Sequence, residues 1–198
     1  PCLSEMVRPS SKPTQKNEIS YMYSDTLPLI LSGNGIAVMK TDTIYGIVGK
    51  ADSHEAVERV YQAKGRTPSK SPIVLISSVT QLFDSYEPNV LNRLKEYWPG
   101  PNSIILPSQK APEWIRRENH SVAYRLPDSP ELQALIEKTG PLIAPSANPE
   151  GLPPALTIAE ARSYFGNSVD WYEDGGLVVN PNPSSLYLYR DGELEQLR

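Results

Sequence analysis

The sequence has 198 residues and a mass of 22 kDa, which suits one globular domain with a single core. Its net charge of −4 and pI near 5.3 argue against a protein whose main role is to coat nucleic acid. No apolar run approaches the roughly 20 residues that span a bilayer, so we expect no membrane segment. The single cysteine, Cys2, excludes a disulfide framework and a cysteine-based zinc site.

The first part of the chain differs in composition from the rest. Residues 1–20 are rich in Ser, Pro and Lys without apolar periodicity, which predicts a flexible N-terminal tail. Residues 21–198 then form the domain. The tail has no basic start followed by an apolar stretch and a small-residue cleavage site, so we expect a cytoplasmic protein.

The domain begins with a short helix, a strand and a longer helix. The short helix ends at SGNG (32–35), and the strand-like run IAVMKTDTIYGIVG (36–49) follows. The pattern SHEAVERVYQAKG predicts a helix that Ser53 caps at its N-terminus. Gly65 sits where a helix end needs a residue that tolerates positive φ.

The middle of the chain consists of short apolar runs separated by polar segments. The runs at 72–78, 103–107, 121–127 and 141–145 predict buried strands. Between the first two, QLFDSYEPNVLNRLKEYW predicts two short helices broken at Pro88.

Two more helices and a hairpin complete the chain. The helices run from Ser129 to Gly140 and from Thr157 to about Phe165, and a hairpin turns at Asp191-Gly192. Because helices and strands alternate and a terminal hairpin must be antiparallel, the sequence predicts an α/β fold with a mixed sheet.

Three polar stretches interrupt the apolar runs: KTDTIYG (40–46) and APSANPEG (144–151) at strand ends, and KGRTPSK (64–70) at a helix end. In α/β folds, ligands bind in the crevice beyond the strand ends, so loops of this kind can converge on one site.

The side chains of these stretches suit a small anionic substrate. Lys64 offers a point charge and Arg66 a planar fork for phosphate oxygens. Hydroxyl and amide groups come from Thr41, Thr43, Ser146 and Asn148. No histidine, paired carboxylate or metal-ligand cluster accompanies them in the sequence. This pattern favours positioning and charge neutralisation, as in phosphoryl or nucleotidyl transfer, with no metal held by the protein.

Each stretch also has a purely structural interpretation. A Lys-Gly-Arg sequence after a helix is typical of an exposed basic C-terminus that complements the helix dipole. Thr-Asp-Thr and Ser-Ala-Asn-Pro are typical of caps and turns. The common phosphate loops GxxxxGK[ST] and GxGxxG are absent from the sequence. The residues alone therefore leave both interpretations open.

The order and spacing of these stretches resemble the YrdC-like family, the threonylcarbamoyl-AMP synthases. The resemblance covers about residue 22 to the end. It rests on GIAVMKTDTIYGIVGKA, VYQAKGRTPSKSPIVLISS, WPGPNSIILP, AYRLPDSP and PLIAPSANPEG, and on the later DGG, PSS and QLR.

This resemblance implies a fold and a reaction. The fold would be a single domain with a twisted, open, mixed parallel and antiparallel sheet flanked by helices, and with a concave ligand groove. The enzyme would be a nucleotidyltransferase that condenses L-threonine, bicarbonate and ATP to threonylcarbamoyl-AMP and pyrophosphate for the t6A37 modification of tRNA. Mg²⁺ would arrive with the phosphates. tRNA and the downstream threonylcarbamoyl-transferase complex would be partners.

The resemblance also implies roles for individual residues. Lys64, Arg66, Ser146 and Asn148 would form the catalytic, nucleotide-gripping set. Thr41, Thr43 and Tyr45 would shape the threonine pocket. The nucleotide side would be completed by Ser103, Arg125, Ser184 and Arg198.

Three positions depart from the family pattern. Lys40 stands in place of proline before Thr-Asp-Thr, Glu150 in place of serine, and Ser185 in place of threonine. We expect Glu150 to face solvent, because an inward carboxylate would repel phosphate. Since the sequence stops at Arg198, we expect the single-domain form of the family.

Three alternatives remain open at this point. One is a double-stranded RNA-binding or tRNA-binding module, or a ribosome-maturation module, on the same fold. Another is an enzyme that makes an acyl-adenylate from carbamoyl phosphate, although such proteins usually carry zinc-binding cysteines. The third is a family member that has lost synthase activity.

Overall fold

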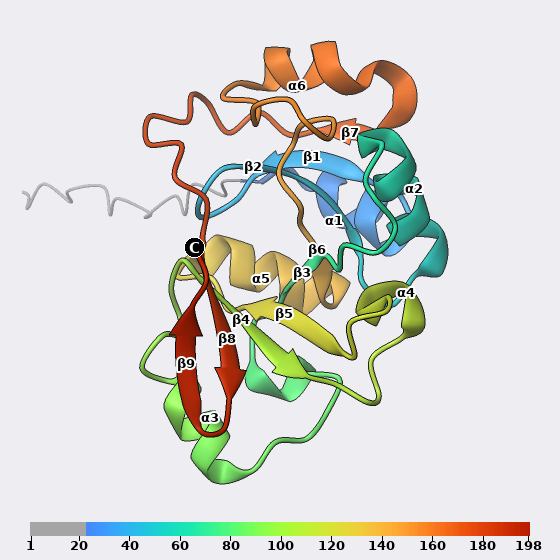
Figure 1. Ribbon diagram of the computed structural model, residues 1–198. Coiled ribbons are helices and arrows are strands. Elements are labelled where there is room, and N and C mark those ends of the chain that lie inside the picture. The colour runs from blue at the N-terminus through green and yellow to red at the C-terminus, as the bar shows by residue number, and fades with distance from the viewer. Residues whose placement is uncertain (1–22) are drawn as a thin grey trace, which may run out of the picture.

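The structure, a computed structural model, describes residues 23–198 (Figure 1). Cys2 and the tail predicted for residues 1–20 lie outside the described residues. The helices are α1 (Thr26–Ser32), α2 (His54–Lys64), α3 (Pro88–Leu94), α4 (Glu113–Arg116), α5 (Pro130–Thr139) and α6 (Ile158–Phe165). Single 3-10 turns are η1 (Val79–Gln81) and η2 (Gly166–Ser168). The strands are β1 (Ala37–Lys40), β2 (Tyr45–Lys50), β3 (Ile73–Leu75), β4 (Asn102–Pro107), β5 (Ser121–Arg125), β6 (Leu142–Ile143), β7 (Trp171–Tyr172), β8 (Ser185–Arg190) and β9 (Glu193–Gln196).

Within residues 23–198, nine strands form one sheet in the order β7-β1-β2-β6-β3-β5-β4-β8-β9. The pairs β1–β7, β3–β5 and β4–β8 are parallel, and the other pairs are antiparallel. The predicted α/β class with a mixed sheet is confirmed. The terminal hairpin β8–β9 joins the sheet through β4, so it extends the main sheet.

Helices cover both faces of the β1–β2 half of the sheet. Because successive side chains of a strand point to opposite faces, neighbouring residues belong to two different cores. Val38 and Ile47 pack in the cluster that also contains residues of α2 and α6. Met39 and Val48 pack in the second cluster, with α1 and α5. Burial on both faces explains why this part of the sequence is almost continuously apolar.

The helix ends follow the predicted caps. The Ser53 hydroxyl accepts a hydrogen bond from the Ala56 amide, and Gly65 adopts φ 59° just after α2. Ser129 and Thr157 cap α5 and α6 in the same manner. These boundaries are local properties of the sequence, which is why they can be read from it.

Two segments differ from the prediction. The run 36–49 divides into two antiparallel strands, because Thr41 takes its backbone and hydroxyl hydrogen bonds back to the Ile44 carbonyl and turns the chain. Pro88 begins α3, whereas the sequence predicted that it would break two helices. Proline's fixed φ suits the first position of a helix, so Pro88 starts α3. The segment before Pro88 contains only the 3-10 turn η1.

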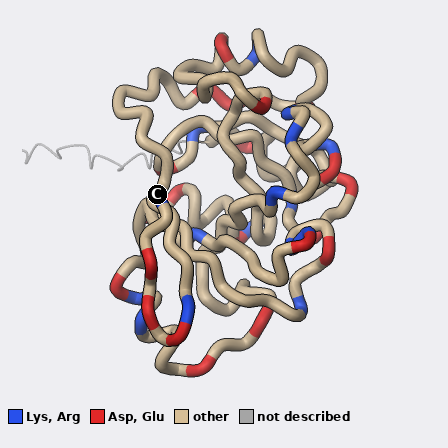
Figure 2. The backbone as a smooth tube through the Cα atoms, viewed as in Figure 1, with Lys and Arg blue, Asp and Glu red and all other residues tan. Residues whose placement is uncertain are grey.

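Basic and acidic residues alternate along the chain without forming large blocks of one sign (Figure 2). No helix among the described residues is long and apolar enough to cross a membrane. The half of the sheet formed by β3, β5, β4 and β8 contributes residues to the cavities described next.

Candidate active site

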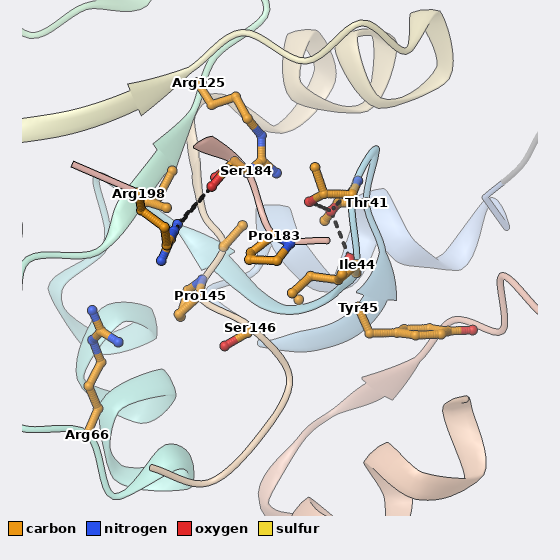
Figure 3. Close-up of a pocket in the computed structure, with 14 residues that line it drawn as sticks. Thr41, Ile44, Tyr45, Arg66, Arg125, Pro145, Ser146, Pro183, Ser184 and Arg198 are labelled. Carbon is orange, nitrogen blue, oxygen red and sulfur yellow. Dashed lines mark hydrogen bonds between the residues drawn. The ribbon is translucent and has the colours of Figure 1, made fainter. Parts of the chain in front are cut away.

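A cavity lies where the β1–β2 turn, the segment after β6 and the chain before β8 meet (Figure 3). It encloses about 600 Å³ of empty space including its mouth, which is in the range of small-molecule sites. Its lining consists of Thr41, Thr43, Ile44, Tyr45, Gly46, Arg66, Ile73, Arg125, Ala144, Pro145, Ser146, Pro183, Ser184 and Arg198.

Most of the residues singled out in the sequence meet here. Those that line the cavity are Thr41, Thr43, Tyr45, Arg66, Arg125, Ser146, Ser184 and Arg198. Lys64, Ser103 and Asn148 lie outside the lining, and each contacts a residue or loop that belongs to it. The three polar stretches of the sequence therefore converge, and the sheet brings Arg125, Ser184 and Arg198 to them.

The β1–β2 turn presents two hydroxyl groups. Thr41 Oγ1 lies 2.8 Å from the Ile44 carbonyl oxygen and 3.2 Å from Thr43 Oγ1. Thr41 is 6% exposed, so its hydroxyl is held by the turn. Thr43 is the freer of the two and offers its hydroxyl at the cavity wall.

The Tyr45 side chain points away from the cavity (Figure 3). Its hydroxyl donates to the Gly176 carbonyl at 2.9 Å and accepts from the Gly175 amide at 3.0 Å. Lys40 holds the same segment, because its ammonium donates to the carbonyls of Gly175 and Leu177 at 3.2 and 3.1 Å. Tyr45 thus lines the cavity mainly with its backbone, and the charge of Lys40 is directed to loop carbonyls.

Lys64 is buried at the end of α2, with 3% of its surface exposed. Its ammonium donates to the backbone carbonyls of Ser146 and Asn148, so it fastens the loop after β6 to the helix. Burial, together with the nearby Arg66 charge, lowers the pKa of Lys64 from 10.5 to about 8.

The three cations of the KGRTPSK stretch have different surroundings. Arg66 is half-buried and lines the cavity, whereas Lys64 lies behind it. Lys70 forms an ion pair with Glu150. Glu150 is exposed, in agreement with the sequence prediction, and the ion pair with Lys70 holds its carboxylate in place. Its carboxylate also accepts a hydrogen bond from the Thr67 amide at 2.6 Å.

Arg125, at the end of β5, forms a buried ion pair that the sequence did not predict. Its Nη2 lies 2.9 Å from Oδ1 of Asp42, and the two side chains are 3% and 7% exposed. The Arg125 Nε is buried without a hydrogen-bond partner. Burial raises the pKa of Asp42 and lowers that of Arg125, and each partner's charge opposes this effect. In the sequence, the feature that could have identified Asp42 as a site residue is its position between Thr41 and Thr43, two candidate site residues.

The C-terminal segment closes another wall. Ser103 Oγ and Ser184 Oγ lie 2.9 Å apart, both buried, so Ser103 supports Ser184 from behind. Arg198 donates from Nη2 to the Ser184 carbonyl at 3.0 Å, and its own carbonyl accepts from the Leu186 amide. The hairpin register thereby fixes Arg198 at the cavity.

The loop after β6 supplies Ser146 and Asn148. Ser146 forms a β-bridge with Gly46 and borders the cavity (Figure 3). The Asn148 amide nitrogen donates to the Leu152 carbonyl at 2.7 Å, while its Oδ1 is buried without a partner. Asn148 thus stabilises the loop and keeps one acceptor unused.

A second, larger cavity adjoins the first. The two share Arg66, Ile73 and Arg198. Apolar residues from four strands line the second cavity, namely Ile73, Ile105, Ala123 and Leu186. Polar side chains of Ser69, Lys70, Ser71, Glu118, Asn119 and Ser121 complete it. Two compartments therefore meet at a pair of arginines. Within residues 23–198, no group of three or more His, Cys, Asp or Glu side chains could hold a metal ion.

Comparisons with known proteins show the family of this chain. The model of the Sua5/YciO/YrdC family, described as "Telomere recombination", matches residues 29–198. A threonylcarbamoyl-AMP synthase of Marinobacter nauticus is 36% identical over 163 residues, which is 79% of this chain and 85% of that protein. One of Pseudomonas aeruginosa is 36% identical over 161 residues, with 79% and 87% covered.

Solved structures show the same fold. The structure of P. abyssi Sua5 complexed with L-threonine matches with a TM-score of 0.79 at 28% identity and covers 87% of this chain. This chain spans 52% of the length of that one. E. coli YciO matches with a TM-score of 0.77, covering 87% of this chain and 86% of its own, and at 21% identity it supports the fold alone. Because the family model spans most of the sequence and relatives above 30% identity cover most of it, the chain belongs to the Sua5/YciO/YrdC family.

Proposed function

We propose that this chain is an L-threonylcarbamoyladenylate synthase, which converts L-threonine, bicarbonate and ATP to threonylcarbamoyl-AMP and pyrophosphate. The observation that carries the proposal is the pair of adjoining compartments with Arg66 and Arg198 at their boundary. A reaction that joins an amino acid to a nucleotide needs two subsites that meet at the reacting phosphate. The names of the relatives support the same activity.

The first cavity, called here the enclosed compartment, suits threonine. The Thr41 and Thr43 hydroxyls can exchange hydrogen bonds with a small polar side chain, and the Arg125 guanidinium can pair with a carboxylate. The P. abyssi relative was solved with L-threonine. We place threonine here, with its amino group directed toward Arg66 and Arg198.

The second, larger cavity, called here the open compartment, suits the nucleotide. A flat base can lie on the apolar floor formed by Ile73, Ile105 and Leu186. The α-phosphate then lies near Arg66 and Arg198, at the boundary with the threonine subsite. Ser146 borders this position from the enclosed side.

The reaction requires no general base at the second step. The threonine amine and bicarbonate first give N-carboxythreonine with loss of water. A carbamate oxygen then bonds to the α-phosphorus, and the bond between that phosphorus and the departing pyrophosphate oxygen breaks. Arg66 and Arg198 would offset the negative charge that accumulates on the phosphorus oxygens and the pyrophosphate.

Mg²⁺ would enter with the phosphates of ATP and supply further charge neutralisation. The residues present fit an ion that is coordinated by phosphate oxygens and water, because the neighbouring carboxylate of Asp42 is already paired with Arg125.

The wider assignment follows from the product. We propose that residues 21–198 form the catalytic domain and that threonylcarbamoyl-AMP passes to a transferase that modifies tRNA at t6A37. We also propose a cytoplasmic location for the enzyme, with tRNA and the transferase complex as its partners.

The test is pyrophosphate release from ATP with Mg²⁺, threonine and bicarbonate, followed by rapid mass spectrometry of the adduct. We expect release only when threonine and bicarbonate are both present, together with the mass of threonylcarbamoyl-AMP. Turnover with carbamoyl phosphate in place of bicarbonate and threonine would favour the second enzyme class. Salt-sensitive tRNA binding without any turnover would favour the RNA-binding module.

Nucleotide affinity should depend on the protonation of Lys64. Its pKa of about 8 means that the ammonium becomes neutral above that pH, and the positive charge that lies behind Arg66 and holds the loop after β6 is lost. We expect the Kd of a non-hydrolysable ATP analogue to rise about tenfold at most between pH 7.5 and 9. Calorimetric titration across this range measures it.

The stability of the fold should not follow the same trend. Because the pKa of Lys64 is lower in the folded chain than its ordinary 10.5, the unfolded chain binds more protons between pH 8 and 10.5. The contribution of Lys64 to stability therefore rises with pH in this window. For nucleotide binding, a Kd of the ATP analogue that stays constant between pH 7.5 and 9 would contradict the prediction that affinity follows the protonation of Lys64.

A further inference from the structure

Glu150 connects two loops of the candidate site. Its carboxylate accepts hydrogen bonds from the Thr67 amide at 2.6 Å and from the Thr67 hydroxyl at 3.1 and 3.0 Å, and it pairs with Lys70. Glu150 belongs to the loop after β6, whereas Thr67 and Lys70 belong to the segment between α2 and β3. The contacts therefore cross from one wall of the site to another.

The segment that Glu150 holds is the one that directs Arg66. The Arg66 Nη2 donates to the Ser71 carbonyl at 3.0 Å, and Nε lies 3.4 Å from the Lys70 carbonyl. Its guanidinium also lies 5.5 Å from the centre of the Tyr61 ring. Because the carbonyls that orient Arg66 belong to a segment that Glu150 contacts at Thr67 and Lys70, removal of that carboxylate is expected to shift the guanidinium.

A second connection fixes the base of the same two loops. The Glu150 amide donates to the Lys64 carbonyl at 2.8 Å, and the Lys64 ammonium returns to the carbonyls of Ser146 and Asn148. These bonds lie at the end of α2. Beyond Gly65, the Tyr61 hydroxyl donates to the Lys70 carbonyl, and Asn119 donates to the Ser69 carbonyl at 2.9 Å. The Glu150 carboxylate adds the contacts that tie this segment to the loop after β6, close to the residue that lines both cavities.

The carboxylate remains ionised under ordinary conditions. Hydrogen bonds from Lys70 and Thr67 lower the pKa of Glu150 to about 2. Its side chain is 31% exposed and that of Lys70 is 56% exposed, so the ion pair alone would contribute little to stability. The effect of Glu150 should therefore appear in the geometry of the site more than in the stability of the fold.

We propose that Glu150 is a positioning residue for nucleotide binding: it fastens the segment 66–71 to the loop 144–151 and thereby aims Arg66 at the phosphates of ATP. This inference rests on the proposed function, because it assigns the phosphates to Arg66. It opposes a purely electrostatic expectation, in which a carboxylate near the phosphates weakens ATP binding and its removal strengthens it.

The test compares Glu150→Ala with Glu150→Gln and with Glu137→Ala. Glu137 is exposed on α5 and its removal changes the net charge equally. We expect Glu150→Ala to raise the Kd of a non-hydrolysable ATP analogue and the KM for ATP about tenfold, with the KM for threonine within twofold of wild type. Glu150→Gln should lie between, because its amide oxygen still accepts from Thr67 but cannot pair with Lys70.

The outcomes separate this inference from the proposed function. An active wild type in which Glu150→Ala binds the analogue as tightly as, or more tightly than, Glu137→Ala would overturn the positioning role alone. A wild type that binds the analogue without forming the adduct would overturn the synthase activity, while the analogue affinities of the variants would still decide the role of Glu150. Equal increases in both KM values, with a lowered melting temperature, would show that Glu150 only stabilises the fold and would also overturn the inference.

Discussion

Arg66→Ala is expected to lower the kcat/KM of threonylcarbamoyl-AMP synthesis by about 10²–10³-fold while leaving the fold intact. Arg66 lines both compartments, so its guanidinium is the cation of the KGRTPSK stretch best placed to meet phosphate oxygens from either side. It is half-buried, and its hydrogen bonds go to the carbonyls of Lys70 and Ser71, which water can solvate after truncation. Initial-rate kinetics and a thermal melt of the same preparation measure both effects.

Two variants make the Arg66 result specific. Arg66→Lys should recover part of the rate, because a point charge replaces the bidentate fork. Arg190→Ala removes the same charge from an exposed position at the end of β8 and should act as wild type. A wild-type rate in Arg66→Ala would remove this residue from the phosphate site.

Asp42→Ala should have the largest effect on stability, a loss of about 3–5 kcal/mol in the free energy of unfolding. The variant leaves the Arg125 charge buried with 3% of the side chain exposed and without its partner at 2.9 Å. A small domain is stable by only about 5–15 kcal/mol, so this loss is a large fraction of the total. Urea denaturation followed by circular dichroism measures it.

A double variant separates the stability of this pair from its role in the site. In Asp42→Leu/Arg125→Met, both charges are replaced by apolar side chains, which often restores stability at a buried pair. We expect stability near wild type but severely reduced threonine-dependent turnover, because the group that pairs with the substrate carboxylate is gone. Wild-type turnover in the double variant would show that Arg125 does not bind threonine, and an Asp42→Ala protein as stable as wild type would show that the pair is dispensable.

The helices were predicted from local signals. Ser53, Gly65, Ser129 and Thr157 form the caps that the sequence indicated, because a cap depends on residues three or four positions away. Pro88 was misread because a proline that breaks a helix and a proline that starts one look alike in sequence. The short elements α4 and β7 were not predicted, since four and two residues carry too little periodicity.

The site was predicted in its composition better than in its detail. The sequence indicated that three polar stretches can converge, and the cavity lining contains residues of all three. It could not show that Lys64 turns inward to bind backbone carbonyls, or that Tyr45 points to Gly176. Side-chain direction depends on partners that are distant in the chain, and Asp42 was passed over for the same reason, because its partner lies on β5.

The sheet joins segments that are far apart in sequence. β1 pairs with β7, β2 with β6, and β4 with β8, and the cavity takes residues from the β1–β2 turn, from the segment after β6 and from the chain before β8. Such pairings form slowly, since long loops must close before any contact repays their lost entropy. A chain with its helices formed but the β8–β9 hairpin undocked would lack Ser184 and Arg198 at the cavity. Ligand binding during refolding would therefore report completion of the whole sheet, whereas helical signal would report only its local parts.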